Sequence, residues 1–189
     1  MSADFHLVCA LLPDGWARDV RLSVGPDGAI TALSVGEAAQ PGDTRLGTIL
    51  PGMTNLHSHA FQRAMAGLSE RRGSGTDSFW SWREIMYRFL DRLDPDAVEA
   101  IAAMVQVEML EAGFTAVGEF HYLHHAPDGS PYDDAGEMAA RICAAATTTG
   151  MALTMLPVFY RWSGFKQAPA TPGQRRFNAD PDLYARLVE

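Results

Sequence analysis

The sequence predicts an α/β fold in which a small region of short strands precedes the beginning of a parallel, helix-covered sheet. Residues 5–35 contain strand-like segments separated by turn signals such as Gly25-Pro-Asp-Gly28. From Thr48 onward, apolar runs alternate with helical patterns, which is typical of parallel strands joined by helical crossovers. The apolar fraction of 47% and the charged fraction of 20% are typical of a globular protein and exclude a disordered chain.

The first segment is predicted to form three strands, at residues 5–12, 17–24 and 29–35. The turn at 25–28 joins the last two strands, because proline presets φ and glycine accepts positive φ. Two hairpins of this kind make a small antiparallel sheet. Such a sheet is only marginally stable alone, so we expect it to need further strands or a body to lie against.

The second segment alternates strands and helices. Asp94 and Pro95 mark the clearest helix start, since aspartate caps a first turn and proline fits its first position. The expected strands are 49–56, 115–120 and 152–159; irregular structure is expected at 69–78; the expected helices are 79–93, 95 to Gly113, Asp133 or Asp134 to Gly150, and one from Pro181. These elements make three βα units. A closed barrel of eight such units requires about 250 residues, so we expect the first part of a longer protein.

Composition limits the partners and the location of the protein. The net charge of −8 argues against nucleic acid and anionic membranes as partners. The N-terminus lacks the features of a secretion signal, and no apolar run is long enough to span a bilayer. The two cysteines, Cys9 and Cys143, form neither a disulfide framework nor a cysteine-based zinc site. We therefore expect a cytoplasmic protein.

The pair His57 and His59 is the most specific chemical feature. Side chains at positions i and i+2 of a strand share one face, about 7 Å apart along the chain at ~3.3 Å per residue. Two imidazoles in that arrangement suit a single metal ion, and ligands gather at the carboxyl ends of parallel strands. The spacing also arises by chance, in which case the histidines are a polar strand end.

The residues around this pair add a resemblance. Residues 50–59 (LPGMTNLHSH) resemble the first-strand motif of the amidohydrolase superfamily, whose members are metal-dependent hydrolases and deaminases. The resemblance implies that residues 51–189 form the first three βα units of a (β/α)8 amidohydrolase barrel. It also implies that residues 1–50 form part of a small β-sandwich, because many members build one from both chain ends.

Three later segments are similar to the N-formimidoyl-L-glutamate deiminase family within that superfamily. They are residues 59–68 (HAFQRAMAGL), 78–87 (SFWSWREIMY) and 118–125 (GEFHYLHH), the last followed by PYDD at 131–134. The resemblance implies hydrolysis of N-formimidoyl-L-glutamate to N-formyl-L-glutamate and ammonia, a step in histidine degradation. It also implies a small dicarboxylate substrate. Large barrels with aromatic surface helices often pair, so we expect a homo-oligomer, a dimer, for the full-length protein.

The resemblance assigns His57 and His59 as two ligands of one divalent metal ion. Zinc is the expected ion, although iron and manganese suit similar ligand sets. The family's remaining ligands, a histidine and an aspartate, come from later strands, and its catalytic glutamate and second histidine lie beyond Glu189. We therefore expect this chain to carry only part of the site and to be inactive alone.

The resemblance also assigns Gln62, Arg83 and Tyr122 to substrate binding. Arg83 suits a carboxylate, because guanidinium presents a planar, bidentate fork. Alternatives remain open at this point: Arg83 as a surface residue paired with Glu84 or Glu111, Gln62 as a solvated residue at a helix start, and Tyr122 as a structural tyrosine.

Other polar residues allow two interpretations. His121, His124 and His125 are either a second metal cluster or loop residues, and Glu119 pairs with Arg83 or is a structural salt-bridged carboxylate. Four aromatic residues are interpreted as core, subunit-contact or substrate-stacking residues: Phe79, Trp80, Trp82 and Tyr87. Arg161 and Trp162, which follow the third strand, are further candidates for the site. Two other functions also stay open, another deaminase of the superfamily acting on a nucleobase or aryl amine, and a non-catalytic truncated scaffold.

Overall fold

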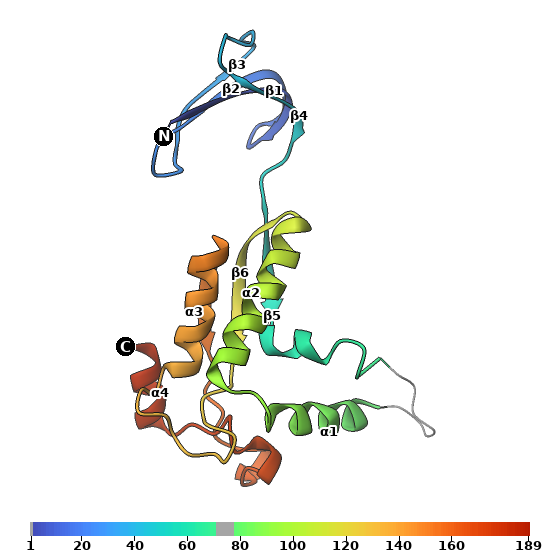
Figure 1. Cartoon of the computed structure of the whole chain (residues 1–189), viewed down its shortest axis with the longest axis vertical. Coiled ribbons are helices and arrows are strands. Elements are labelled where there is room, and N and C mark those ends of the chain that lie inside the picture. Colours follow the sequence, from blue (N-terminus) through green and yellow to red (C-terminus); the bar gives the residue numbers. More distant parts are fainter. Residues whose placement is uncertain (1, 71–77) are drawn as a thin grey trace. The chain divides into compact units, whose positions relative to one another are not determined.

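The computed structural model describes residues 2–70 and 78–189 and divides into two compact units, Met1–Gly52 and Met53–Glu189. Most of the irregular stretch that the sequence predicts at 69–78 lies on residues 71–77, outside the described residues. Each unit is described separately below (Figure 1).

The first unit is a four-stranded sheet. Its strands are β1 (Ala3–Leu12), β2 (Gly15–Val24), β3 (Ile30–Val35) and β4 (Thr44–Ile49), in the order β3-β2-β1-β4. Adjacent strands β1, β2 and β3 are antiparallel, whereas β4 pairs in parallel with β1. Leu7, Ala10 and Val20 form its small core, with Phe5 and Ile49 packed against them.

Strand β4 corrects two sequence-based expectations. The sheet is mixed rather than purely antiparallel, and the single strand expected at 49–56 is two strands that belong to different sheets. The break falls at Pro51 and Gly52, where proline has no N–H to donate to a ladder. Gly47, with no side chain to pack, weakened the strand pattern that β4 otherwise carries.

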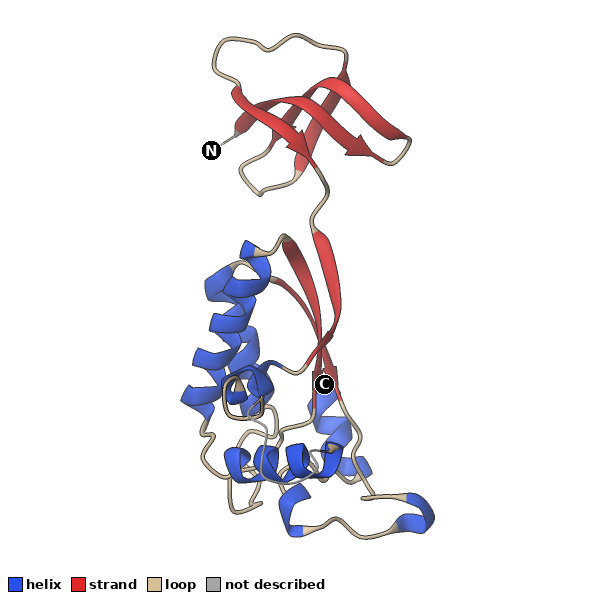
Figure 2. Cartoon of the chain, turned by 90° about the vertical axis from the view of Figure 1, so that its right-hand side faces the viewer, coloured by secondary structure: helices blue, strands red, loops and turns tan. Residues whose placement is uncertain are grey.

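The second unit is a three-stranded parallel sheet covered by helices on one face (Figure 2). Its elements are β5 (Met53–Ser58), the 3-10 turn η1 (Ala60–Met65), α1 (Phe79–Leu90), α2 (Pro95–Glu111), β6 (Phe114–His121), α3 (Glu137–Thr149), β7 (Ala152–Pro157), the 3-10 turns η2 (Phe165–Gln167) and η3 (Pro172–Gln174), and α4 (Pro181–Val188). The order β5-β6-β7 with α2 and α3 as crossovers gives the three βα units that the sequence predicts.

Local caps explain where the helices begin. Asp94 accepts the Ala97 N–H at 2.8 Å and starts α2, as predicted. Helix α3 begins later than the sequence suggested, because Asp134 instead accepts the Gly136 N–H at 2.8 Å in a local turn. Gly150 ends α3 in the left-handed conformation at φ 80°.

The two faces of the second unit's sheet differ. One face packs on α2 and α3, and Val117 lies there with Met109 of α2. The other face exposes apolar side chains of all three strands, among them Leu56, Phe120 and Leu156. Because the strands are parallel, their carboxyl ends meet at one edge, and α1 with the long connections gathers there (Figure 1). Functional side chains of α/β proteins collect at this edge.

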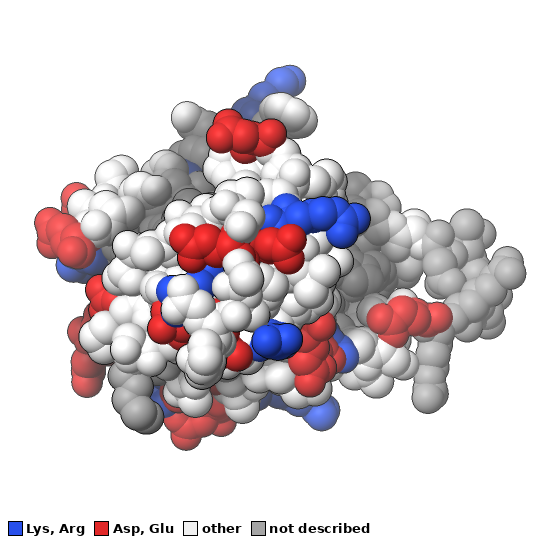
Figure 3. All heavy atoms as spheres, turned by 90° about the horizontal axis from the view of Figure 1, so that it is seen from above, with Lys and Arg blue, Asp and Glu red and all other residues white. Residues whose placement is uncertain are grey.

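Acidic side chains are interspersed with basic ones on the face shown in Figure 3. Among the described residues, none of the helices is both long and apolar enough for a membrane span.

Candidate active site

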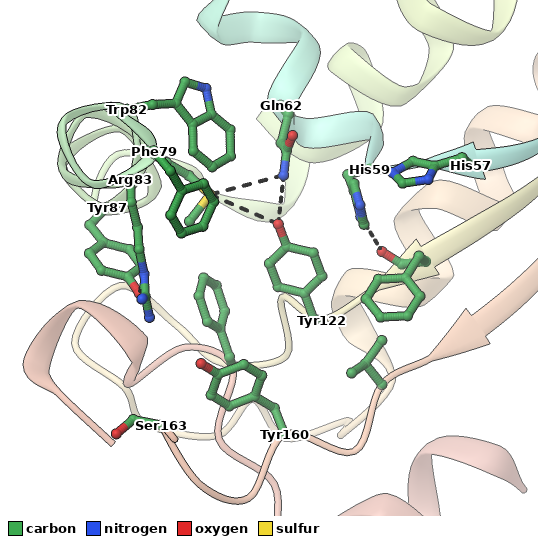
Figure 4. Close-up of a pocket in the computed structure, with 14 residues that line it drawn as sticks. His57, His59, Gln62, Phe79, Trp82, Arg83, Tyr87, Tyr122, Tyr160 and Ser163 are labelled. Atoms are coloured by element: carbon green, nitrogen blue, oxygen red, sulfur yellow. Dashed lines mark hydrogen bonds between the residues drawn. The ribbon is translucent and has the colours of Figure 1, made fainter. Parts of the chain in front are cut away.

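A cavity of about 580 Å³ opens at the carboxyl edge of the parallel sheet (Figure 4). Residues from all three strand ends, from η1 and from α1 form its wall. They are His57, His59, Gln62, Phe79, Trp82, Arg83, Met86, Tyr87, Phe120, Tyr122, Val158, Tyr160, Ser163 and Phe177. The cavity thus brings together all five residues that the sequence nominates, His57, His59, Gln62, Arg83 and Tyr122.

A β-bulge directs the histidine pair into the cavity. The pairing of β5 with β6 runs from Asn55 opposite Val117 to Ser58 opposite Glu119, so β5 uses one extra residue. Such a bulge leaves backbone groups unpaired and re-aims side chains. The Asn55 side chain accepts the His57 N–H at 3.0 Å and so satisfies a donor in the bulge.

The hydrogen bond of His59 defines which ring nitrogen is available. His59 Nδ1 lies 3.1 Å from the Phe120 carbonyl oxygen, and a carbonyl only accepts, so Nδ1 carries the proton. Nε2 is then left with a lone pair, which is the form of histidine that binds metals. The two imidazole rings are 5.1 Å apart between centroids and nearly perpendicular, at 87°.

This pair fits part of a metal site. Over the described ranges, 2–70 and 78–189, no three His, Cys, Asp or Glu side chains converge as a complete ligand set. Structural and catalytic zinc sites use three or four protein ligands. His57 and His59 lie close enough to act on one ion, but two side chains are fewer than such a site requires.

Glu119 lies beneath the histidine pair and corrects an expectation. Its carboxylate is 2% exposed and accepts the Ala60 N–H at 2.7 Å, with the Ser58 hydroxyl also interacting. In the described part of the chain it forms no ion pair, with Arg83 or any other base. Burial raises the pKa of Glu119, and the two hydrogen bonds oppose that rise. Its role here is to hold the turn on both sides of His59.

Gln62 and Tyr122 form a hydrogen-bonded pair on the cavity wall. Gln62 Nε2 donates to the Tyr122 hydroxyl oxygen at 2.7 Å, so Gln62 is a half-buried, hydrogen-bonded residue of the cavity wall (Figure 4). The Tyr122 ring packs edge-on against His59 and Phe177. Burial raises the pKa of Tyr122 to about 12, so its hydroxyl keeps its proton at neutral pH.

Arg83 extends from α1 toward the cavity (Figure 4). Its Nε–H donates to the Tyr87 hydroxyl, and its guanidinium carbon lies 5.7 Å from the Trp80 ring centroid and 5.2 Å from that of Tyr87. Within residues 2–70 and 78–189, no carboxylate forms a salt bridge with it, so the alternative pairing with Glu84 or Glu111 is wrong. A cation held by aromatic rings, with no acid beside it, suits an anionic ligand.

The second histidine group lies outside this cavity. His121 and His124 are each 2% exposed and contact each other edge-on, with centroids 5.4 Å apart. His124 Nε2 donates to the Val158 carbonyl, and His125 Nε2 to that of Asn178. Burial lowers the pKa of His121 to about 3 and of His124 to about 4, which keeps both rings neutral at physiological pH. Their hydrogen bonds tie the loops that follow β6 and β7.

The aromatic residues of α1 divide between two roles. Phe79, Trp82 and Tyr87 line the cavity, whereas Trp80 is 66% exposed and lies under Arg83. Arg161 and Trp162 contact each other and are not part of the cavity wall.

Sequence reasoning missed two residues of this wall that carry polar groups, Tyr160 and Ser163. Tyr160 stands three residues beyond β7, at the carboxyl edge where sites collect, and that position was the available signal. Phe177, which contacts the rings of Tyr87, Tyr122 and Tyr160, comes from the distant loop before α4 and had no such signal.

The comparisons with known proteins agree with this architecture. Residues 5–47 match "Formimidoylglutamate deiminase HutF, N-terminal domain", and residues 48–188 match "Amidohydrolase family". The formimidoylglutamate deiminase of Pseudomonas aeruginosa is 51% identical over 180 residues, which cover 95% of this chain and 40% of that protein.

Solved structures extend the comparison. An amidohydrolase from Brucella melitensis is 57% identical with a TM-score of 0.94, over 98% of this chain and 41% of that one. A zinc-bound adenosine deaminase from Xanthomonas campestris shares the fold at 16% identity and a TM-score of 0.64, over 97% and 38% of the two chains.

The chain spans about 40% of the length of the curated relative. The match over residues 48–188 and the structural likeness confirm the superfamily inferred from the residues around His57 and His59, and the predicted α/β class with a partial barrel. This chain belongs to the amidohydrolase family.

Proposed function

We propose that the protein containing this chain hydrolyses N-formimidoyl-L-glutamate to N-formyl-L-glutamate and ammonia in histidine degradation. The observation that carries the proposal is the cavity, where a histidine pair suited to a metal faces an arginine that pairs with no acid among residues 2–70 and 78–189. The 51% identity to a formimidoylglutamate deiminase supports the same substrate.

The metal half of the proposal rests on His57 and His59. A divalent ion, expected to be zinc, would supply a water molecule acidic enough to attack the substrate near neutral pH. His59 offers Nε2 because its Nδ1–H is engaged by the Phe120 carbonyl, and Glu119 fixes the turn by accepting the Ala60 N–H. These contacts pre-organise the histidine before any ion binds.

The substrate half rests on Arg83, Gln62 and Tyr122. N-formimidoyl-L-glutamate carries two carboxylates, and guanidinium binds a carboxylate through two parallel hydrogen bonds. The Tyr122 oxygen accepts from Gln62, and its hydroxyl donates only to the weak acceptor Met86 Sδ at 3.9 Å, so a substrate oxygen would be a stronger acceptor for that proton. A neutral nucleobase would leave Arg83 without a counter-charge, so this arrangement favours a dicarboxylate over a base.

The direct test is ammonia release by the purified full-length protein from N-formimidoyl-L-glutamate, with adenosine and an aryl amine as alternative substrates. Rapid release from the first compound alone supports the proposal. Faster release from adenosine or the aryl amine would replace it with another deaminase, and no release from any compound by metal-loaded protein would favour a scaffold.

A further inference from the structure

Tyr160 presents a hydroxyl group to the cavity beside Arg83 (Figure 4). It follows β7, and its ring packs against Phe177 with centroids 5.8 Å apart. Its backbone is tied to the loop before α4, because the Ala179 N–H donates to the Tyr160 carbonyl at 2.9 Å. Both the ring and the main chain are therefore held in place.

A buried glutamine determines the direction of the hydrogen bond at this hydroxyl. Gln174 is 0% exposed, and its Oε1 accepts from both the N–H and the hydroxyl of Thr171, at 2.8 and 2.9 Å. Those two donors identify the amide oxygen, so the other end of the amide is the NH₂ group. Gln174 Nε2 lies 2.7 Å from the Tyr160 oxygen and must donate to it.

The turn that carries Gln174 is itself packed tightly against α1. A side chain on Gly173 would meet the Tyr87 ring at 2.4 Å, a contact that only glycine avoids. Tyr87 in turn accepts the Nε–H of Arg83. The turn, Tyr87 and Arg83 are thus one packed unit on this side of the cavity.

Among the described residues, the Tyr160 hydroxyl donates no hydrogen bond to a protein acceptor. Its oxygen accepts from Gln174 and also interacts with the Arg83 guanidinium, which can only donate. The hydroxyl is therefore a donor directed at whatever occupies the cavity, next to a guanidinium that needs an anion.

We propose that Tyr160 is an additional substrate-binding residue, which donates its hydroxyl hydrogen bond to the carboxylate that Arg83 binds. The inference rests on the proposed function, since it takes the ligand to be a dicarboxylate. Burial raises the pKa of Tyr160, so the hydroxyl remains a donor at neutral pH.

The test uses Tyr160→Phe in the metal-loaded full-length protein. This change removes only the oxygen and keeps the ring that packs on Phe177. A hydrogen bond to a charged group is worth enough that its loss should raise KM for N-formimidoyl-L-glutamate by about 10- to 100-fold. We expect kcat to change less than about 3-fold, because the contact is made to the substrate rather than to the reacting carbon.

Tyr184→Phe is the matched control. The Tyr184 hydroxyl donates to the Pro157 carbonyl at 3.3 Å, outside the cavity wall, so its loss should leave KM unchanged. The double variant with Arg83→Met supplies a second measurement. If both residues hold one carboxylate, their effects on KM should be clearly less than multiplicative.

Calorimetric titration with N-formyl-L-glutamate separates the two proposals. Weaker binding to Tyr160→Phe supports the inference even if the wild type fails to release ammonia from N-formimidoyl-L-glutamate, in which case only the proposed reaction is wrong. A KM and an affinity equal to those of Tyr184→Phe would overturn the inference and make Tyr160 a packing residue, whatever the reaction. Fully multiplicative effects in the double variant would also overturn it.

Discussion

Replacing Arg83 tests whether the cavity selects a dicarboxylate. Arg83→Met keeps an unbranched side chain on α1, so packing against Trp80 and Tyr87 is largely preserved. What is lost is the cation and its fork of donors. In the described part of the chain no carboxylate is paired with Arg83, so its removal strands no buried acid, and the measured effect reports on the ligand.

The size of the effect follows from the geometry. Arg83 is half-buried beside two aromatic rings, and this chain carries a net charge of −8 that repels a dianion. A charge-assisted pair in such a place is worth about 1.5–3 kcal/mol. Losing it should lower kcat/KM for N-formimidoyl-L-glutamate by about 10- to 150-fold. Arg83→Lys should recover only part, because it restores the charge without the fork.

The assay is steady-state ammonia release by full-length protein, from N-formimidoyl-L-glutamate and from an analogue that lacks one carboxylate. Arg88→Met is the matched control, since Arg88 is exposed on the same helix and does not line the cavity. If the analogue lacks the carboxylate that Arg83 binds, Arg83→Met should lower kcat/KM for the dianion much more than kcat/KM for the analogue.

Two results would refute this reasoning. The first is an equal loss of kcat/KM for the dianion and for each of the two analogues that lack one carboxylate. That result would mean that Arg83 acts through the structure of α1. Activity as high as that of Arg88→Met on the dianion would mean that no carboxylate contacts Arg83. Either result removes the main structural argument for a dicarboxylate.

Three further outcomes are expected for the full-length protein. His57→Ala should abolish retention of the metal equivalent through dialysis, as measured by elemental analysis, and full retention would refute the ligand assignment. Asn55→Ala should weaken metal affinity by about 10- to 100-fold, measured with a competing chelator, because the His57 N–H loses its acceptor. His121 and His124, whose pKa values burial lowers to about 3 and about 4, should make the free energy of unfolding fall as pH drops from about 6.5 to about 4. Each histidine adds up to about 1.4 kcal/mol per pH unit to the slope of the unfolding free energy in that window, and adds nothing to the slope above it. Denaturation measured at a series of pH values should show a smaller slope for His121→Asn.

Periodicity and caps predicted most of the second unit. Asp94 with Pro95 starts α2, and Gly150 ends α3, because such end signals act within one helical turn. The start of α3 was misjudged, since Asp134 can bond either a helix N–H or a nearer turn N–H, and only the surrounding loop decides between them. Strand β4 was missed because its parallel partner β1 is distant in sequence.

The five residues nominated from the sequence lie around one cavity, but their contacts with one another did not follow from the sequence. The motif resemblance nominated Gln62 and Tyr122 separately, and their mutual hydrogen bond follows only once η1 and the end of β6 are adjacent. Tyr160 and Gln174 were not nominated, because their pairing depends on the irregular connection between β7 and α4. Contacts between loops have no period that a sequence pattern could reveal.

His57 and His59 both face the cavity, as their spacing predicts, but a regular strand does not account for this arrangement. In a regular strand Asn55 would share their face, because positions 55, 57 and 59 follow the two-residue period. The structure instead turns Asn55 toward α2, where its Nδ2 lies 3.3 Å from the sulfur of Met109, while both histidines line the cavity. The extra residue between Asn55 and Ser58 explains why Asn55 and the two histidines point to different faces, since a one-residue shift moves a side chain to the opposite face. The Asn55 side chain, by accepting the His57 N–H, then holds the bulge that its own position requires.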